Sequence, residues 1–225
     1  MIRLAIVDLD GTLAYTIPGM HKAINAVRKS VGCDEVEESR LFESINNATP
    51  GFIKPLIEDT PLKDNLEEAI NRYLEVYNKT CIEGSVPYDG IKDTMLKLRD
   101  IGMGVVVFSN KDNDRVSMIM RHHFSGVFNE YIGTGIYPGK PDPTGPLAIA
   151  KKYGAYPTET IFIGDSEMDI QTAKNSGMVR LSVTWGYRDR DFLIKAGAQY
   201  LADKPNDILT VINEINNIQR RGEIK

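Results

Sequence analysis

The feature that most constrains this chain is a series of short apolar runs, most of which end at acidic or hydroxyl-bearing residues. The runs span residues 3–9, 104–109, 160–164 and 179–183, with a weaker one at 200–202. Short runs rich in Val, Ile and Leu are typical of strands buried on both faces of a parallel sheet. Helical patterns separate them, at 90–101, 112–123, 144–153, 168–176 and 206–220. Strands that alternate with helices predict an α/β fold with a doubly wound parallel sheet.

One long interval breaks this alternation. Between residues 14 and 86 the sequence has no convincing strand, and three stretches have helical patterns, at 21–31, 35–46 and 62–81. An interval of about 70 residues is too long for a single connection between neighbouring strands. We therefore predict a core domain formed by residues 1–13 and 87–225, with an all-α domain inserted over residues 14–86.

Charge and apolar content exclude several classes of protein. The 225 residues carry a formal net charge of −4, so the basic surface of a nucleic-acid-binding protein is not expected. The longest uninterrupted apolar run, 105–108, is far shorter than the ~20 residues that cross a bilayer, and residues 1–13 do not resemble a signal peptide. Two cysteines, Cys33 and Cys81, do not make a disulfide framework. These features predict a soluble cytoplasmic protein that binds neither nucleic acid nor membrane.

The first apolar run ends in two carboxylates, Asp8 and Asp10, which Gly11 and Thr12 follow. Open α/β sheets bind their ligands at the carboxyl ends of the strands. Two carboxylates this close repel each other unless a cation or a shared proton intervenes. Carboxylate oxygens suit Mg²⁺, above all where a phosphate shares the ion. The motif therefore predicts a metal-binding turn at the end of the first strand.

Two further motifs offer groups for an anion. Ser109 and Asn110 directly follow the apolar run 105–108, where a hydroxyl can hydrogen-bond a phosphate. Lys140 precedes a pair of prolines, which stiffen the segment and hold the ammonium in place. A fixed ammonium binds phosphate as a point charge. Each motif alone is also compatible with an ordinary turn or loop.

The last motif adds two more carboxylates. Asp165 follows the apolar run 160–164, and Asp169 lies four residues on, at the start of a helical pattern. At the end of its strand, Asp165 can reach a cation that it shares with Asp8. Asp169 either supports such a site or is an ordinary acid in the first turn of a helix.

In this order, the four motifs resemble those of the haloacid dehalogenase superfamily of phosphohydrolases. The segment 184–188, TWGYR, is similar to the phosphoglycolate-phosphatase-like branch. The resemblance implies a Rossmann-like core with an all-α cap, which here would be the inserted domain. It implies that Asp8 is the nucleophile and forms an aspartyl-phosphate. It also implies that Asp10 is the general acid and then the general base.

The same resemblance implies the remaining site residues. Mg²⁺ would be held by Asp8, Asp165 and Asp169, together with the main-chain carbonyl of Asp10. The phosphoryl group would be bound by Thr12, Ser109, Asn110 and Lys140. The implied activity is that of a Mg²⁺-dependent phosphatase acting on a small phosphorylated metabolite, phosphoglycolate-like or a sugar phosphate.

Several alternatives stay open on the sequence. A sugar-phosphate mutase has the same core and transfers the phosphoryl group between hydroxyls. A phosphonatase requires a lysine from the cap, for which Lys22 and Lys54 are the candidates. A non-catalytic interaction protein would usually lack a motif residue, and none is missing. A dehalogenase is disfavoured by Asp10 together with Asp165, and the chain is far longer than a phospho-receiver domain.

Substrate contacts in the inserted domain are predicted for the segment 47–54, as a loop facing the site. Gly51 matches a glycine found in caps of relatives, and Lys54 could meet an anionic substrate. A plain helix–helix turn explains the same segment equally well. Hinges are expected near Ala14 and Pro87, and the sequence does not distinguish a monomer from a homodimer.

Overall fold

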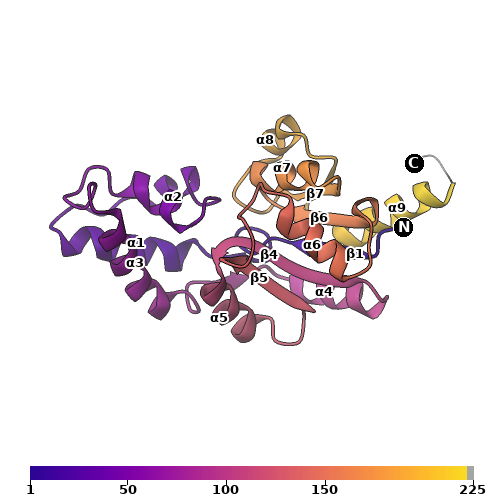
Figure 1. The fold of residues 1–225 in the computed structure, drawn as a ribbon, viewed down its shortest axis with the longest axis horizontal. Coiled ribbons are helices and arrows are strands. Elements are labelled where there is room, and N and C mark those ends of the chain that lie inside the picture. Colours follow the sequence, from indigo (N-terminus) through magenta and orange to yellow (C-terminus); the bar gives the residue numbers. More distant parts are fainter. Residues whose placement is uncertain (222–225) are drawn as a thin grey trace.

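The computed structural model describes residues 1–221, and its core is a six-stranded parallel sheet in the order β5-β4-β1-β6-β7-β8 (Figure 1). The strands are β1 (Leu4–Val7), β4 (Gly104–Asp112), β5 (Glu130–Thr134), β6 (Thr160–Gly164), β7 (Val179–Val183) and β8 (Tyr200–Ala202). β1 lies between β4 and β6, which follow it after long intervals in the chain. The predicted doubly wound α/β fold is confirmed.

Helices cover both faces of the sheet because alternate strand residues point to opposite sides. The core helices are α4 (Ile91–Asp100), α5 (Asn113–His123), α6 (Thr144–Lys152), α7 (Glu167–Asn175), α8 (Arg190–Ala196) and α9 (Asp207–Arg221), with a 3-10 turn at Pro157–Glu159. Ala5 and Val7 of β1 pack in one apolar cluster with α4, α5 and α9. Leu4 and Ile6 pack in a second cluster with α6 and α7. All four side chains are fully buried, which explains why the strand reads as one apolar run.

The segment between β2 (Ala14–Tyr15) and β3 (Val86–Pro87) forms a helical body beside the sheet, on the left in Figure 1. Its elements are α1 (Ile17–Ser30), a 3-10 helix at Glu38–Glu43, α2 (Thr49–Ile53), a 3-10 turn at Lys54–Leu56 and α3 (Leu66–Thr80). β2 and β3 pair antiparallel where the chain leaves the core and returns to it. We call this helical body the cap. The exact domain boundaries, 13/14 and 86/87, stay a prediction.

Two predictions for the cap are wrong in detail. The helix expected over 35–46 is only the 3-10 helix at Glu38–Glu43. The loop expected over 47–54 contains α2. Pro50 lies in the first turn of this helix, where a residue without an N–H breaks no helical hydrogen bond.

Within residues 1–221, no helix combines the length and apolar character needed to cross a membrane.

Candidate active site

The site lies where three neighbouring strands end at the same edge of the sheet. Asp8 directly follows β1, Ser109 lies in the last part of β4, and Asp165 directly follows β6. Because β1 pairs in parallel with both β4 and β6, these side chains come together at the carboxyl edge of the sheet. On one side of β1 the sheet continues with β4 and β5, and on the other side with β6, β7 and β8. Open α/β sheets commonly bind ligands where the strand order reverses in this way.

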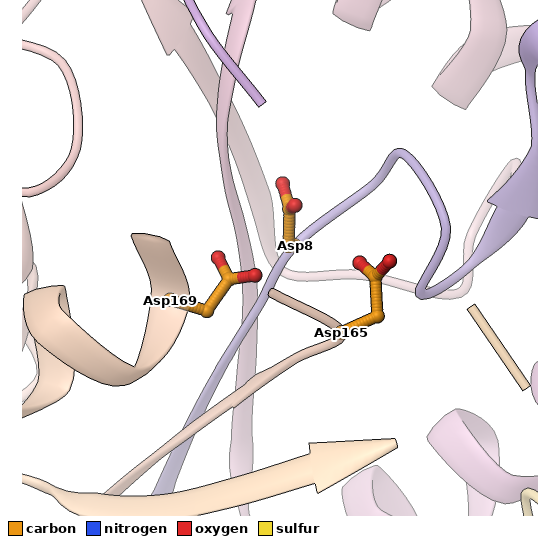
Figure 2. Close-up of side chains that lie close together, drawn as sticks. All are labelled: Asp8, Asp165 and Asp169. Carbon is orange, nitrogen blue, oxygen red and sulfur yellow. The ribbon is translucent and has the colours of Figure 1, made fainter. Parts of the chain in front are cut away.

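Three carboxylates converge at this edge, from Asp8, Asp165 and Asp169 (Figure 2). An oxygen from each lies within 4.8 Å of the others, and all three residues are buried. The turn after β1 is built to let Asp165 approach. Gly11 has a φ of +79°, and a Cβ there would lie 2.3 Å from Oδ2 of Asp165. Only glycine fits this position, both for its backbone angle and for the space.

Lys140 is the cation nearest to the three carboxylates. Its Nζ lies 2.8 Å from Oδ1 of Asp8 and 2.7 Å from Oδ1 of Asp169. Burial acts to lower the pKa of this ammonium, but the carboxylates of Asp169 and Asp8 outweigh it and raise the pKa above its usual value. Lys140 therefore stays charged and links the nucleophile candidate to the start of α7.

Asn110 holds the backbone of Lys140 through its side-chain amide. Its Oδ1 accepts a hydrogen bond from the backbone N–H of Lys140 at 2.7 Å, and its Nδ2 donates to the carbonyl of Lys140 at 3.1 Å. The same amide donates to the carbonyl of Asn46 in the cap at 3.0 Å. Asn110 thus positions Lys140 and also lines the cavity, and its contact with a phosphate stays a prediction.

The side chain of Thr12 makes a contact that the sequence did not predict, while its contact with a phosphoryl group stays a prediction. Its side chain is fully buried, and its hydroxyl donates to Oδ1 of Asp165 at 3.0 Å. The backbone N–H of Tyr187 donates to Oδ2 of the same carboxylate at 2.7 Å. Both oxygens of Asp165 are therefore fixed by donors. Thr12 orients a metal-ligand candidate instead of facing the cavity. Ser109, in contrast, lines the cavity as expected.

The charges of the cluster fit a divalent cation. Burial, with the neighbouring Asp169 and Asp10, raises the pKa of Asp8 to about 7 against the opposing effect of Lys140. Burial, with Asp169 and Asp8, also holds the pKa of Asp165 well above its usual value. Oδ1 of Asp8 is buried and accepts no hydrogen bond, since its contact with Lys140 is an ion pair outside hydrogen-bonding geometry. A hard cation beside Asp8, Asp165 and Asp169 would relieve this repulsion.

The side chain of Asp10 lies apart from these three carboxylates and faces the cap. Its Oδ1 accepts a hydrogen bond from the hydroxyl of Thr16 at 2.5 Å and lies 3.0 Å from Nζ of Lys111. Lys111 was not among the predicted site residues. Its position in the sequence could have indicated a role, because Lys111 directly follows Ser109 and Asn110 at the end of a buried strand. A buried charge at such a position needs a partner.

A cavity of about 20 Å³ lies between these core residues and the cap, with room for one water molecule. Asp8, Asp10, Ser109, Lys111 and Lys140 line it from the core. The cap lines it with apolar and neutral side chains, among them Met20, Asn46, Phe52, Tyr73 and Tyr77. A phosphorylated metabolite is larger than this space, so the cap must move away for a substrate to enter.

Gly51 and Lys54, the predicted cap contacts, do not line this cavity. Both are exposed, on α2 and at the start of the 3-10 turn that follows it. The helical turn places Phe52 rather than Gly51 toward the core. Their predicted contacts with a substrate are therefore not seen in this arrangement of cap and core.

A second junction between cap and core lies at the segment after β7. The hydroxyl of Tyr187 accepts a hydrogen bond from the backbone N–H of Thr16 at 3.0 Å, and its ring packs on Phe42 of the cap. Arg188 donates to the carbonyl of Phe42 at 2.9 Å and forms a two-point ion pair with Glu167. The cap is thus held against the core by polar contacts at two places, Asn110 with Asn46 and Arg188 with Phe42.

Comparison with known proteins agrees with this geometry. The family described as haloacid dehalogenase-like hydrolase matches residues 5–183, which is most of the chain and includes all four motifs. The chain belongs to this family. A phosphoglycolate phosphatase of Vibrio cholerae is 26% identical over 219 residues, covering 94% of this chain and 97% of the relative. One from Pseudomonas putida is 28% identical and covers 82% of this chain and 70% of the relative.

Among solved structures, one described as a predicted phosphoglycolate phosphatase from Haemophilus somnus superposes with a TM-score of 0.84. It is 25% identical, and the match covers 94% of this chain and 98% of that one. The family and these relatives support the expectation of a hydrolase that acts on phosphoric monoesters. They match the cap as well as the core, since almost the whole chain is covered.

Mg²⁺ is expected to raise the Tm of this protein, and to raise it more at about pH 8 than at about pH 5.5. The folded-state pKa of Asp8 is raised to about 7, so between its usual value and about 7 the folded state binds more protons than the unfolded one. Stability without metal therefore falls as pH rises through this window. At a free Mg²⁺ concentration of about 100 times the dissociation constant, binding would add about 2.7 kcal/mol to the free energy of unfolding.

Thermal unfolding with and without Mg²⁺ at the two pH values measures this effect. Asp165→Asn is the control, because it removes one carboxylate of the cluster and should reduce the shift. An equal shift in the variant and the parent protein would contradict a metal site at these residues.

Proposed function

We propose that this chain is a Mg²⁺-dependent phosphatase that hydrolyses a small phosphomonoester through an aspartyl-phosphate at Asp8. The observation that carries the proposal is the placement of Asp8, which is buried at the end of β1, with Lys140 at 2.8 Å and the carboxylates of Asp165 and Asp169 beside it. An anionic nucleophile attacks a phosphoryl group only where positive charge offsets the repulsion between them. Lys140 supplies one positive charge beside Asp8, and a divalent cation held by the carboxylates would supply the rest.

The reaction then has two steps. A carboxylate oxygen of Asp8 forms a bond to phosphorus while the bond from phosphorus to the ester oxygen breaks, and Asp10 gives a proton to that leaving oxygen. In the second step Asp10 takes a proton from water, whose oxygen displaces the carboxylate and releases phosphate. Bound beside Asp8, Asp165 and Asp169, Mg²⁺ would supply electrostatic stabilisation of the phosphoryl oxygens.

Other residues position these groups. Thr16 and Lys111 both contact Oδ1 of Asp10, which leaves Oδ2 free for the leaving oxygen. Ser109 lines the cavity next to Asp8, where its hydroxyl would donate to a phosphoryl oxygen. Lys22 and Lys54, the lysines that a phosphonatase would use from the cap, are exposed and do not line the cavity, which disfavours that alternative.

The test is a screen of small phosphorylated metabolites with Mg²⁺, in which released phosphate is measured. We expect hydrolysis of at least one small phosphomonoester, and loss of that activity when the metal is chelated. Isomerisation of a sugar phosphate without release of phosphate would favour the mutase. Neither release nor transfer across the panel would overturn the enzymatic proposal in favour of a non-catalytic role.

A further inference from the structure

Lys111 is a buried cation that the proposed reaction uses only indirectly. Its side chain is 4% exposed, and its Nζ lies in the wall of the cavity between Asp10 and the cap. Lys140 is the other lysine of the cavity, and it is committed to Asp8 and Asp169, on the side of the phosphoryl group. Lys111 instead lies beside the general acid, and therefore on the side of the leaving group.

The contacts of Lys111 leave part of its hydrogen-bonding capacity weakly used. The ammonium has three donors. One faces Asp10 at 3.0 Å, and another donates to the hydroxyl of Tyr77 at 2.8 Å. The third faces the sulfur of Met20 at 3.8 Å, and a thioether is a weak acceptor. An anion on a bound substrate would be a far better partner for this third donor.

The side chains around Lys111 favour a contact with an anionic group of the substrate over one with a neutral group. Apolar or aromatic side chains of the cap, from Met20, Phe52, Tyr73 and Tyr77, surround this part of the cavity. Burial raises the pKa of Tyr77 well above its usual value, so its phenol stays neutral and does not offset the charge of Lys111. A cation in such surroundings favours an anionic partner over a neutral hydroxyl, because little water screens the interaction.

We propose that Lys111 is a specificity-determining residue whose ammonium binds a carboxylate on the leaving group, one or two carbons from the ester oxygen. The substrate class is then that of phosphorylated small hydroxy acids, rather than sugar phosphates with neutral leaving groups. The inference rests on the proposed function, because it assumes that Asp10 faces the leaving oxygen. Phosphoglycolate, in which the carboxylate is attached to the carbon that bears the ester oxygen, is the smallest member of the class.

The test compares two substrates of nearly equal size, 2-phosphoglycolate and 2-hydroxyethyl phosphate, which differ in carrying a carboxylate or a neutral hydroxymethyl group. The parent protein should prefer 2-phosphoglycolate. Lys111→Met should lower kcat/KM for both substrates, because Lys111 also contacts Asp10. The loss should be about 10- to 100-fold greater for 2-phosphoglycolate than for 2-hydroxyethyl phosphate, with the additional loss mainly in KM. Lys63→Met, which replaces an exposed cap lysine outside the cavity, is the matched control and should leave the ratio of the two kcat/KM values unchanged.

An equal loss for both substrates would mean that Lys111 acts only through Asp10 or the fold, and would overturn the proposal. So would a parent protein that hydrolyses both equally well. Calorimetric titration of 2-phosphoglycolate into Asp8→Asn, with and without Lys111→Met, measures binding without turnover. It therefore separates failure of the Lys111 assignment from failure of the proposed function. If neither substrate releases phosphate but 2-phosphoglycolate still binds selectively and Lys111→Met abolishes that binding, the proposed reaction is wrong and the assignment of Lys111 as the carboxylate-binding residue stands. Selective binding that survives Lys111→Met would overturn the assignment of Lys111.

Discussion

Asp8→Asn is expected to lower kcat by about 10,000-fold or more while the fold survives. The amide has nearly the shape of the carboxylate, but it cannot form the covalent bond to phosphorus on which the proposed mechanism depends. Stability should not suffer in the metal-free protein. Burial raises the pKa of Asp8 to about 7, so at about pH 8 this carboxylate is ionised at a cost that the neutral amide avoids.

Two measurements check this prediction. Phosphate release under single-turnover conditions gives the loss of activity, and thermal unfolding at about pH 8 without metal should give a Tm at or above that of the parent protein. Asp64→Asn, at an exposed position of the cap, is the control for the loss of one carboxylate. Turnover by Asp8→Asn within tenfold of the parent rate would refute the assignment of the nucleophile.

Lys140→Met is expected to reduce both activity and stability. The ammonium is 3% exposed and contacts the carboxylates of Asp8 and Asp169, so its removal leaves both without their nearest cation. Removing one partner of a buried ion pair typically costs about 3–5 kcal/mol. The activity should fall because the phosphoryl group approaching Asp8 loses the same positive charge.

Urea unfolding of the metal-free protein and steady-state kinetics measure the two effects. The double variant Lys140→Met with Asp169→Asn separates them, because it removes one of the two carboxylates left unpaired. We expect the double variant to recover part of the stability and none of the activity. An unchanged unfolding free energy in Lys140→Met would show that the ion pairs contribute nothing to the fold.

Much of the sheet could be predicted because its strands are buried on both faces. β1, β4, β6 and β7 are apolar runs, and apolar runs of this kind have few other interpretations. β5 was missed because it lies at the edge of the sheet and begins with Glu130, so its sequence reads as partly polar. The helix expected over 35–46 is replaced by one 3-10 helix, in which Leu41 is buried.

The candidate site could be predicted where its residues lie at strand ends, since parallel strands bring their carboxyl ends to one edge. Asp8 and Asp165 were found in this way, Asp169 was found at the start of the helical pattern that follows Asp165, and the three carboxylates do converge. The contacts of Lys111 with Tyr77 and of Arg188 with Phe42 could not be predicted, because they depend on how the cap lies against the core. The same holds for Gly51 and Lys54, whose positions depend on the short helix that the sequence did not indicate.

The central claim is that Asp8 carries the phosphoryl group, and mass spectrometry after rapid acid quench tests it most directly. The protein is mixed with Mg²⁺ and a substrate found in the screen, quenched within one turnover and digested with trypsin, and the peptide of residues 4–22 is analysed by fragmentation. We expect an added mass of one phosphoryl group on Asp8, absent in Asp8→Asn. Phosphate release with no adduct at this position, or with the adduct on another residue, would contradict it.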